Sequence, residues 1–69
     1  MQKQDVIWYE EVYTCVMEED GWWINLVANH FKYKFWYEIE MPDGSFADFT
    51  TKDIYEAIDK LHELKKEVR

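Results

Sequence analysis

The chain has 69 residues, of which 48% are hydrophobic and 19% aromatic, and its formal net charge is −7. This composition excludes intrinsic disorder, which requires low hydrophobicity, and the length predicts a single domain over residues 1–69 with a thin core. No apolar run approaches the ~20 residues that cross a bilayer, and the acidic balance disfavours nucleic acid and anionic membranes as direct partners.

Three turn signals divide the first part of the chain into predicted strands. Asp20-Gly21 is a two-residue hairpin signal, and Asn29-His30 is a weaker one because Asn and His tolerate positive φ. Pro42-Asp43-Gly44 suits a three-residue loop with a bulge. The aromatic and β-branched runs between these turns predict a sheet over about 5–49, with strands at about 5–18, 22–29, 31–41 and 45–49.

The three turns also predict how the strands pair. A loop at Asp20-Gly21 places Met17 opposite Ile24, and a loop at Asn29-His30 places Ile24 opposite Phe35. The third turn places Tyr37 opposite Phe49. All three pairings agree on one apolar face, which we expect to form the core of the domain. Its residues are Tyr13, Cys15, Met17, Ile24, Leu26, Tyr33, Phe35, Tyr37 and Ile39.

A helix is predicted over about 51–68. Thr50 or Thr51 can serve as its N-cap, and Asp53 lies in the first turn, where the helix dipole favours a carboxylate. One narrow apolar stripe follows the helical period and consists of Ile54, Ala57, Ile58, Leu61, Leu64 and Val68. The fold class is therefore α+β, an antiparallel three- to four-stranded sheet with one C-terminal helix packed on one face, in the order β-β-β-(β)-α.

The sheet face away from the helix is the predicted binding site. Trp23 and Trp36 fall opposite each other in the predicted pairing, and carboxylates surround them. Aromatic anchors inside a charged rim are typical of protein interfaces. We therefore expect partner binding through Trp23, Trp36, Glu18, Glu38, Glu40 and Asp48.

Two other interpretations of this face stay open. A Trp–Trp pair across two strands stabilises a sheet by roughly 0.5–1.5 kcal/mol beyond its burial, so the two residues can be structural. The face can also be covered by residues 1–10, whose pairing the turns do not define, or by a second copy of the chain.

The charge distribution indicates what kind of partner to expect. Residues 1–48 hold ten acidic side chains against three lysines, whereas residues 49–69 hold five of each sign. The negative pole of the molecule is therefore the predicted sheet. A protein with a basic surface is the partner that this pole attracts.

Catalytic and metal-binding patterns are missing from the sequence. His30, His62 and Cys15 are far apart and lack structural-zinc spacing, and Ser45 is the only serine. The two glycines form no phosphate loop. An alternation of aromatic residues and lysines over 31–36 resembles a stacking platform for nucleic acid, but the surrounding acidity disfavours that function. We expect no enzyme activity, no cofactor and no metal.

The single cysteine and the N-terminal residues bear on the compartment. Cys15 cannot form an intrachain disulfide, and residues 1–5 lack the regions of a signal peptide, so we expect a cytoplasmic protein. Size and charge together favour a small acidic protein-binding module or inhibitor, of the kind that phages and mobile elements encode. It would dock on a basic protein surface, such as one that normally holds nucleic acid. The alternative is a structural or homodimeric domain that buries its open sheet face in self-association.

Overall fold

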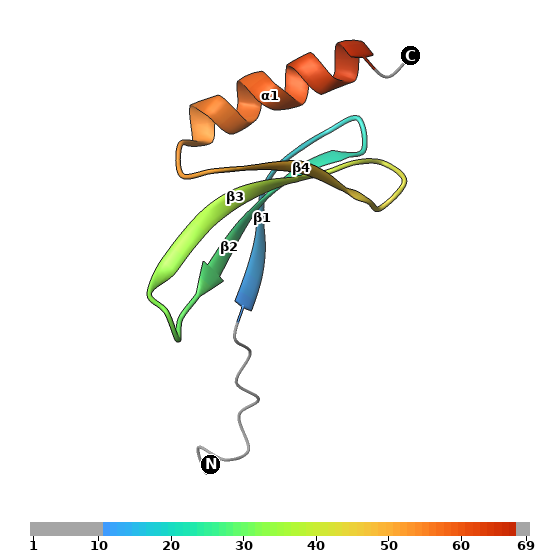
Figure 1. Cartoon of the computed structure of the whole chain (residues 1–69). Coiled ribbons are helices and arrows are strands. Elements are labelled where there is room, and N and C mark those ends of the chain that lie inside the picture. The colour runs from blue at the N-terminus through green and yellow to red at the C-terminus, as the bar shows by residue number, and fades with distance from the viewer. Residues whose placement is uncertain (1–10, 68–69) are drawn as a thin grey trace.

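The computed structural model describes residues 11–67 of the chain, and it confirms the α+β fold. Four antiparallel strands form one sheet in the order β1-β2-β3-β4, and a single helix lies against one face of it (Figure 1). The predicted strand residues 5–10 and the helix residue Val68 lie outside the described range. The elements are β1 (Glu11–Glu19), β2 (Trp22–Asn29), β3 (Lys34–Glu40), β4 (Phe46–Thr51) and α1 (Ile54–Glu67).

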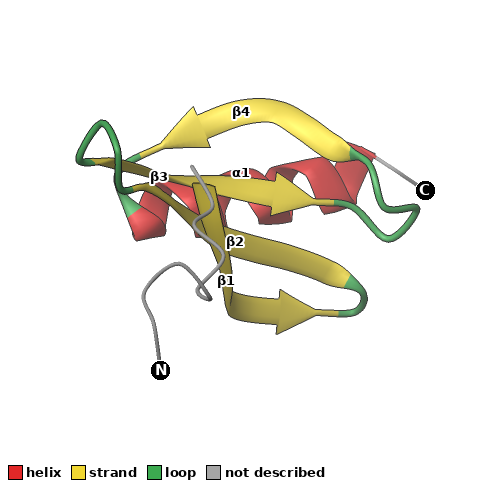
Figure 2. Cartoon of the chain, turned by 90° about the horizontal axis from the view of Figure 1, so that it is seen from below, coloured by secondary structure: helices red, strands yellow, loops and turns green. Residues whose placement is uncertain are grey.

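The core lies between α1 and the strands β2, β3 and β4. Ala57 and Leu61 of the helix are fully buried, and so are Ile24 and Ile39 of the sheet. The rest of the helical stripe within the described range is partly buried against this cluster. Figure 1 shows that the start of β1, the end of β2 and the start of β3 extend beyond the helix. In Figure 2, the helix lies behind the strands, so the opposite sheet face, called the open face below, has no covering element among residues 11–67.

The first turn has the predicted geometry. Asp20 and Gly21 both have positive φ, 54° and 85°, as a two-residue hairpin turn that matches the strand twist requires. Gly44 in the third turn also has positive φ, 89°. These two turns therefore confirm the sequence signals.

The second turn is longer than predicted. Its loop spans residues 30–33, because the side-chain oxygen of Asn29 accepts hydrogen bonds from the backbone N–H groups of Phe31 and Lys32 at 3.2 and 3.0 Å. This Asx-type turn replaces the two-residue turn that Asn29-His30 suggested. Tyr33 consequently lies in the loop with 93% of its surface exposed, so its predicted place in the core is wrong.

The longer loop shifts the pairing of β2 with β3 by four residues. Ile24 lies opposite Ile39 instead of Phe35, and Leu26 lies opposite Tyr37. Because the shift is an even number, every side chain keeps its predicted face. Phe35 is on the helix side of the sheet as predicted, but it lies outside the core, half-exposed beneath the ammonium group of Lys52.

A bulge in β1 reverses the faces of its first half. Met17 lies opposite Ile24 as predicted, but the pairing shifts between Cys15 and Met17, so Cys15 lies opposite Asn25 and Tyr13 opposite Val27. One extra residue in a strand turns every following side chain to the other face. Tyr13 and Cys15 are therefore exposed on the open face, and the prediction that they belong to the core is wrong.

For the pairing of β3 with β4, one predicted pair is correct and another is wrong. Glu40 lies opposite Phe46, which the predicted third turn implies, but an irregularity between Glu38 and Glu40 places Tyr37 opposite Thr51 rather than Phe49. Phe49 still packs against the core, because this shift is also an even number.

The helix begins later than predicted and uses a different cap. The carboxylate of Asp53 accepts a hydrogen bond from the backbone N–H of Tyr55 at 2.9 Å, so Asp53 is the N-cap and α1 begins at Ile54. The hydroxyl of Thr51 accepts from the N–H of Asp53 at 3.1 Å and donates to Glu56 at 2.6 Å. Thr51 therefore supports the cap, and the prediction that a threonine is the cap itself is wrong.

Candidate protein-binding site

Four side chains form a row across the open face, one from each strand. Glu18 lies opposite Trp23, Trp23 opposite Glu40, and Glu40 opposite Phe46. We call this set the acid–aromatic row. Neighbouring strands are roughly 4.8 Å apart, so each aromatic side chain of the row stands next to a carboxylate. The pairing thus places acids and rings alternately along one line.

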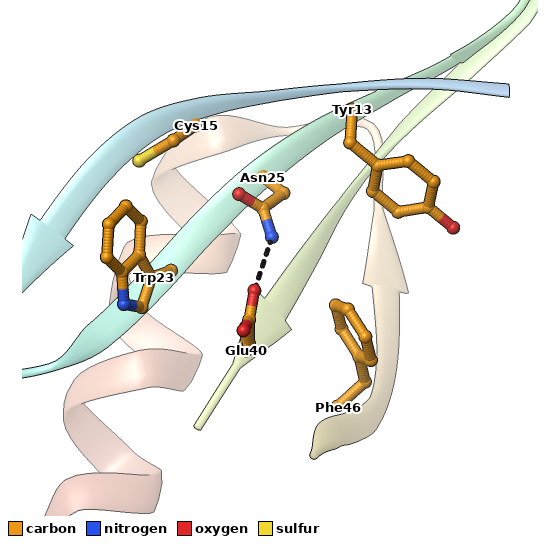
Figure 3. Close-up of a pocket in the computed structure, with 6 residues that line it drawn as sticks. All are labelled: Tyr13, Cys15, Trp23, Asn25, Glu40 and Phe46. Carbon is orange, nitrogen blue, oxygen red and sulfur yellow. Dashed lines mark hydrogen bonds between the residues drawn. The ribbon is translucent and has the colours of Figure 1, made fainter. Parts of the chain in front are cut away.

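A groove lies along this row. Its volume is about 470 Å³, and its walls and floor are formed by Tyr13, Cys15, Trp23, Asn25, Glu40 and Phe46. Figure 3 shows the carboxylate of Glu40 between the rings of Trp23 and Phe46. Trp23 is 40% exposed and Phe46 is 49% exposed. The groove therefore presents large apolar surfaces to solvent on both sides of a carboxylate.

Hydrogen bonds hold the two carboxylates of the row in place. The side-chain amide of Asn25, which is only 7% exposed, donates to Oε1 of Glu40 at 3.1 Å. The backbone N–H of Gly21 donates to Oε2 of Glu18 at 2.8 Å. These donors are neutral, so they orient the two side chains without cancelling their charge.

The other predicted site residues lie on the same face, outside the groove. The predicted opposition of Trp23 and Trp36 is wrong, because the longer second turn places Trp36 opposite Val27. Trp36 is half-buried, and its indole N–H donates to Oε1 of Glu38 at 2.8 Å. Asp48 is exposed on β4, in alternation with Phe46. The structure therefore brings Glu18, Trp23 and Glu40 together and separates Trp36, Glu38 and Asp48 from them.

The carboxylates at the hairpin end on the helix side of the sheet have cationic partners. Lys65 binds Glu19 at 2.6 Å and Asp20 at 2.8 Å, and His62 lies 3.2 Å from Glu19. Hydrogen bonds from Lys65 and His62 lower the pKa of Glu19, and the bonds to Asp20 and Glu19 raise the pKa of Lys65. The hairpin end is thereby fastened to the C-terminal turns of α1.

No such pairing occurs on the open face within residues 11–67. All ion pairs in this range involve Lys60, His62 or Lys65 of the helix, and none reaches Glu18, Glu38, Glu40 or Asp48. The four predicted rim carboxylates therefore have no ion-pair partner in the described part of the chain.

Tyr13 shows the electrostatic consequence of these carboxylates. Partial desolvation raises the pKa of Tyr13, the charge of Glu38 raises it further, and a hydrogen bond to Glu11 at 3.2 Å adds to the effect. The ring of Tyr13 lies 6.5 Å from the ring of Phe46. Tyr13 thus forms the far aromatic wall of the groove within a negative field.

Sequence reasoning missed four of the groove residues, for two reasons. Tyr13 and Cys15 reach the open face only through the bulge in β1. Alternation along the strands places Asn25 and Phe46 on the open face, but the predicted site does not include them. The third turn already implied the pairing of Glu40 with Phe46, and that pairing was the available signal.

Comparison of the chain with protein-family models, curated proteins and solved structures gives no match. In residues 11–67, no helix is long and apolar enough to cross a membrane. The same residues contain no group of three or more His, Cys, Asp or Glu side chains arranged to hold a metal ion. The chemistry of the open face is thus the basis for a functional assignment.

Proposed function

We propose that this protein is a protein-binding module whose open sheet face docks on a basic surface of its partner. The observation that carries this proposal is the acid–aromatic row, in which exposed rings alternate with carboxylates that have no cationic neighbour within residues 11–67. Trp23 and Phe46 supply apolar contact area, and Glu18 and Glu40 supply charge complementary to lysine and arginine.

Such docking supports a role as an inhibitor. A basic surface covered by this face can no longer hold the anion that it otherwise binds, and nucleic acid is the expected anion for a surface of that sign. The lone Cys15 is exposed without a disulfide, which supports a reducing, cytoplasmic setting. The biological role proposed is therefore that of a small acidic inhibitor, of the type made by phages and mobile elements.

The test begins by identifying the partner and then compares two aromatic variants. The tagged protein captures its partner from host extracts, and surface plasmon resonance measures the purified pair. Trp23→Ala should weaken binding by at least ~2 kcal/mol, because a central aromatic anchor dominates interface energy. Tyr55→Ala is the matched control, since Tyr55 is 74% exposed on the opposite side, on α1. Its affinity should equal that of the wild type.

The rim carboxylates should act on the rate of association. Glu38→Gln should slow association at low salt and leave dissociation nearly unchanged, because exposed charges steer the encounter. Trp36→Ala should have a smaller effect than Trp23→Ala, since Trp36 is half-buried and bonded to Glu38. Equal affinities for wild type and a folded Trp23→Ala variant would exclude the open face as the interface. A wild-type dimer that Trp23→Ala converts to a monomer would instead establish self-association through this face.

A further inference from the structure

Resting on the proposed function, we infer that the groove receives an arginine side chain of the partner, with its guanidinium stacked on Trp23 and bonded to Glu40. This names the chemical group that the acid–aromatic row recognises. Three features of the groove carry the assignment: the order of residues across the strands, the anchoring of the carboxylate, and the shape of the apolar walls.

The order across the strands places a ring between two negative charges. Trp23 has Glu18 as its neighbour on β1 and Glu40 as its neighbour on β3. A cation over the indole face gains a cation–π contact and lies within reach of both carboxylates. An ammonium group is compact and strongly hydrated, whereas a guanidinium is planar, stacks on an aromatic face and presents five donors. Arginine therefore matches this arrangement better than lysine does.

The anchoring of Glu40 makes it a prepared acceptor. Asn25 donates to Oε1 of Glu40, and Asn25 itself is 7% exposed, so the carboxylate is held above a buried polar floor. A carboxylate has about four acceptor positions, and this hydrogen bond uses one of them. The remaining positions can receive the parallel donors of a guanidinium, which form the strongest kind of side-chain ion pair.

The size and walls of the groove suit a long side chain. At about 470 Å³ it exceeds the volume of one side chain, so the methylene stem can lie in it together with the charged head. Phe46 and Tyr13 line the groove beyond Glu40, with ring centroids 6.5 Å apart. An arginine stem commonly rests on such apolar surfaces while its head is bonded to a polar group.

The experiment is a titration followed by NMR. The tripeptide Gly-Arg-Gly is added to the full chain, and the indole N–H resonance of Trp23 is monitored. Gly-citrulline-Gly serves as the matched neutral probe, because citrulline keeps the shape of arginine without the charge. We expect a saturable shift with the arginine peptide and an association constant at least ~10-fold lower with the citrulline peptide.

Two variants localise the binding to the groove. Glu40→Gln can keep the hydrogen bond from Asn25 but removes the charge, and it should lower the association constant for Gly-Arg-Gly about tenfold. Asp48→Asn removes the same charge from the same face outside the groove and should retain wild-type binding. Unchanged amide dispersion verifies that each variant is folded, and Glu18→Gln replaces Glu40→Gln if the latter unfolds.

Several results would overturn the inference. Equal binding of the arginine and citrulline peptides would exclude recognition of charge, and equal losses in Glu40→Gln and Asp48→Asn would show attraction to the whole face instead of the groove. A lysine tripeptide that binds at least as well would exclude a guanidinium site. If the peptides show no arginine preference while Trp23→Ala still abolishes partner binding, the inference fails and the proposed function stands. If the peptides show the arginine preference but a folded Trp23→Ala variant binds the partner as tightly as the wild type, only the proposed function is rejected.

Discussion

Trp22 and Trp23 are neighbours in the sequence and have opposite environments. Trp22 points to the helix side and is 6% exposed within the core, whereas Trp23 is 40% exposed on the open face. Alternation along β2 separates the two rings, but alternation alone does not bury either of them. The single helix makes the difference, because it covers one face of the sheet, while no other element of residues 11–67 covers the face that carries Trp23.

Glu18 and Glu19 repeat this contrast for charge. Glu19 faces the helix and is bonded to Lys65 and His62, while Glu18 faces the open side and accepts only a neutral N–H donor among the contacts of residues 11–67. Aromatic and acidic side chains on the helix side therefore stabilise the fold. The same residue types on the open face remain available for a partner, and the predictions below test this division.

The largest effect is expected in the covered core. Leu61 is fully buried between the helix and the sheet, so Leu61→Ala should lower the free energy of unfolding by about 2–5 kcal/mol. Val12→Ala is the control, because Val12 lies near the start of β1, is half-exposed, and should change stability by less than ~0.5 kcal/mol. Urea denaturation measures both. Similar losses of unfolding free energy in the two variants would mean that coverage by the helix does not make one sheet region more important for stability than the other.

A smaller effect is expected where the helix begins. Asp53→Ala removes the N-cap bond to the backbone N–H of Tyr55 and should cost about 1 kcal/mol. Asp59→Ala removes the same charge from an exposed position within the helix and should change stability less. The two urea midpoints provide the comparison, and a greater loss for Asp59→Ala would contradict the capping role of Asp53.

The contacts of Glu19 with Lys65 and His62, which join the hairpin end to α1, should affect the pH dependence of stability. Bonds from Lys65 and His62 hold the pKa of Glu19 below its ordinary value of 4.5. A carboxyl with a lowered folded-state pKa stabilises the fold above its ordinary pKa, and this contribution disappears as the pH falls through the lower value.

Lys65→Met should therefore flatten the fall in stability below pH 4.5 relative to the wild type. The free energy of unfolding from urea titrations at a series of pH values gives the two slopes. Lys34→Met removes one positive charge from an exposed strand end and should keep the wild-type slope. A slope in Lys65→Met equal to that of the wild type would show that the pairs with Glu19 do not contribute.

The bulge in β1 predicts a change in reactivity rather than in stability. Cys15 is exposed in the groove, so a thiol reagent should label it in the native protein at a rate within about tenfold of the rate in denaturant. The double variant Cys15→Ser, Met17→Cys places the thiol just beyond the bulge on the helix side, where labelling should be slower. Slow labelling of native Cys15 would contradict the bulge and favour the regular strand that the sequence predicts.

The sequence by itself determined the type and order of the elements and left open only whether the sheet has three or four strands. Two of its three turns have the predicted residues in the left-handed conformation, and the helical stripe places Ala57 and Leu61 in the core. Both pairing errors around β3 left the faces of its side chains unchanged. Strand side chains alternate with a period of two. A pairing error of two or four residues therefore leaves every side chain on its predicted face, and the hydrophobic pattern cannot reveal it.

Only the tertiary structure decided the composition of the groove. Residues 12–17 are mostly apolar or β-branched on both possible faces, so their pattern fits a regular strand and a bulged strand equally well. The bulge adds one residue, and that odd shift brings Tyr13 and Cys15 into the groove that Trp23 also lines. The longer second turn likewise separates Trp23 from Trp36. Both features depend on contacts between strands, which a pattern read along one strand does not contain.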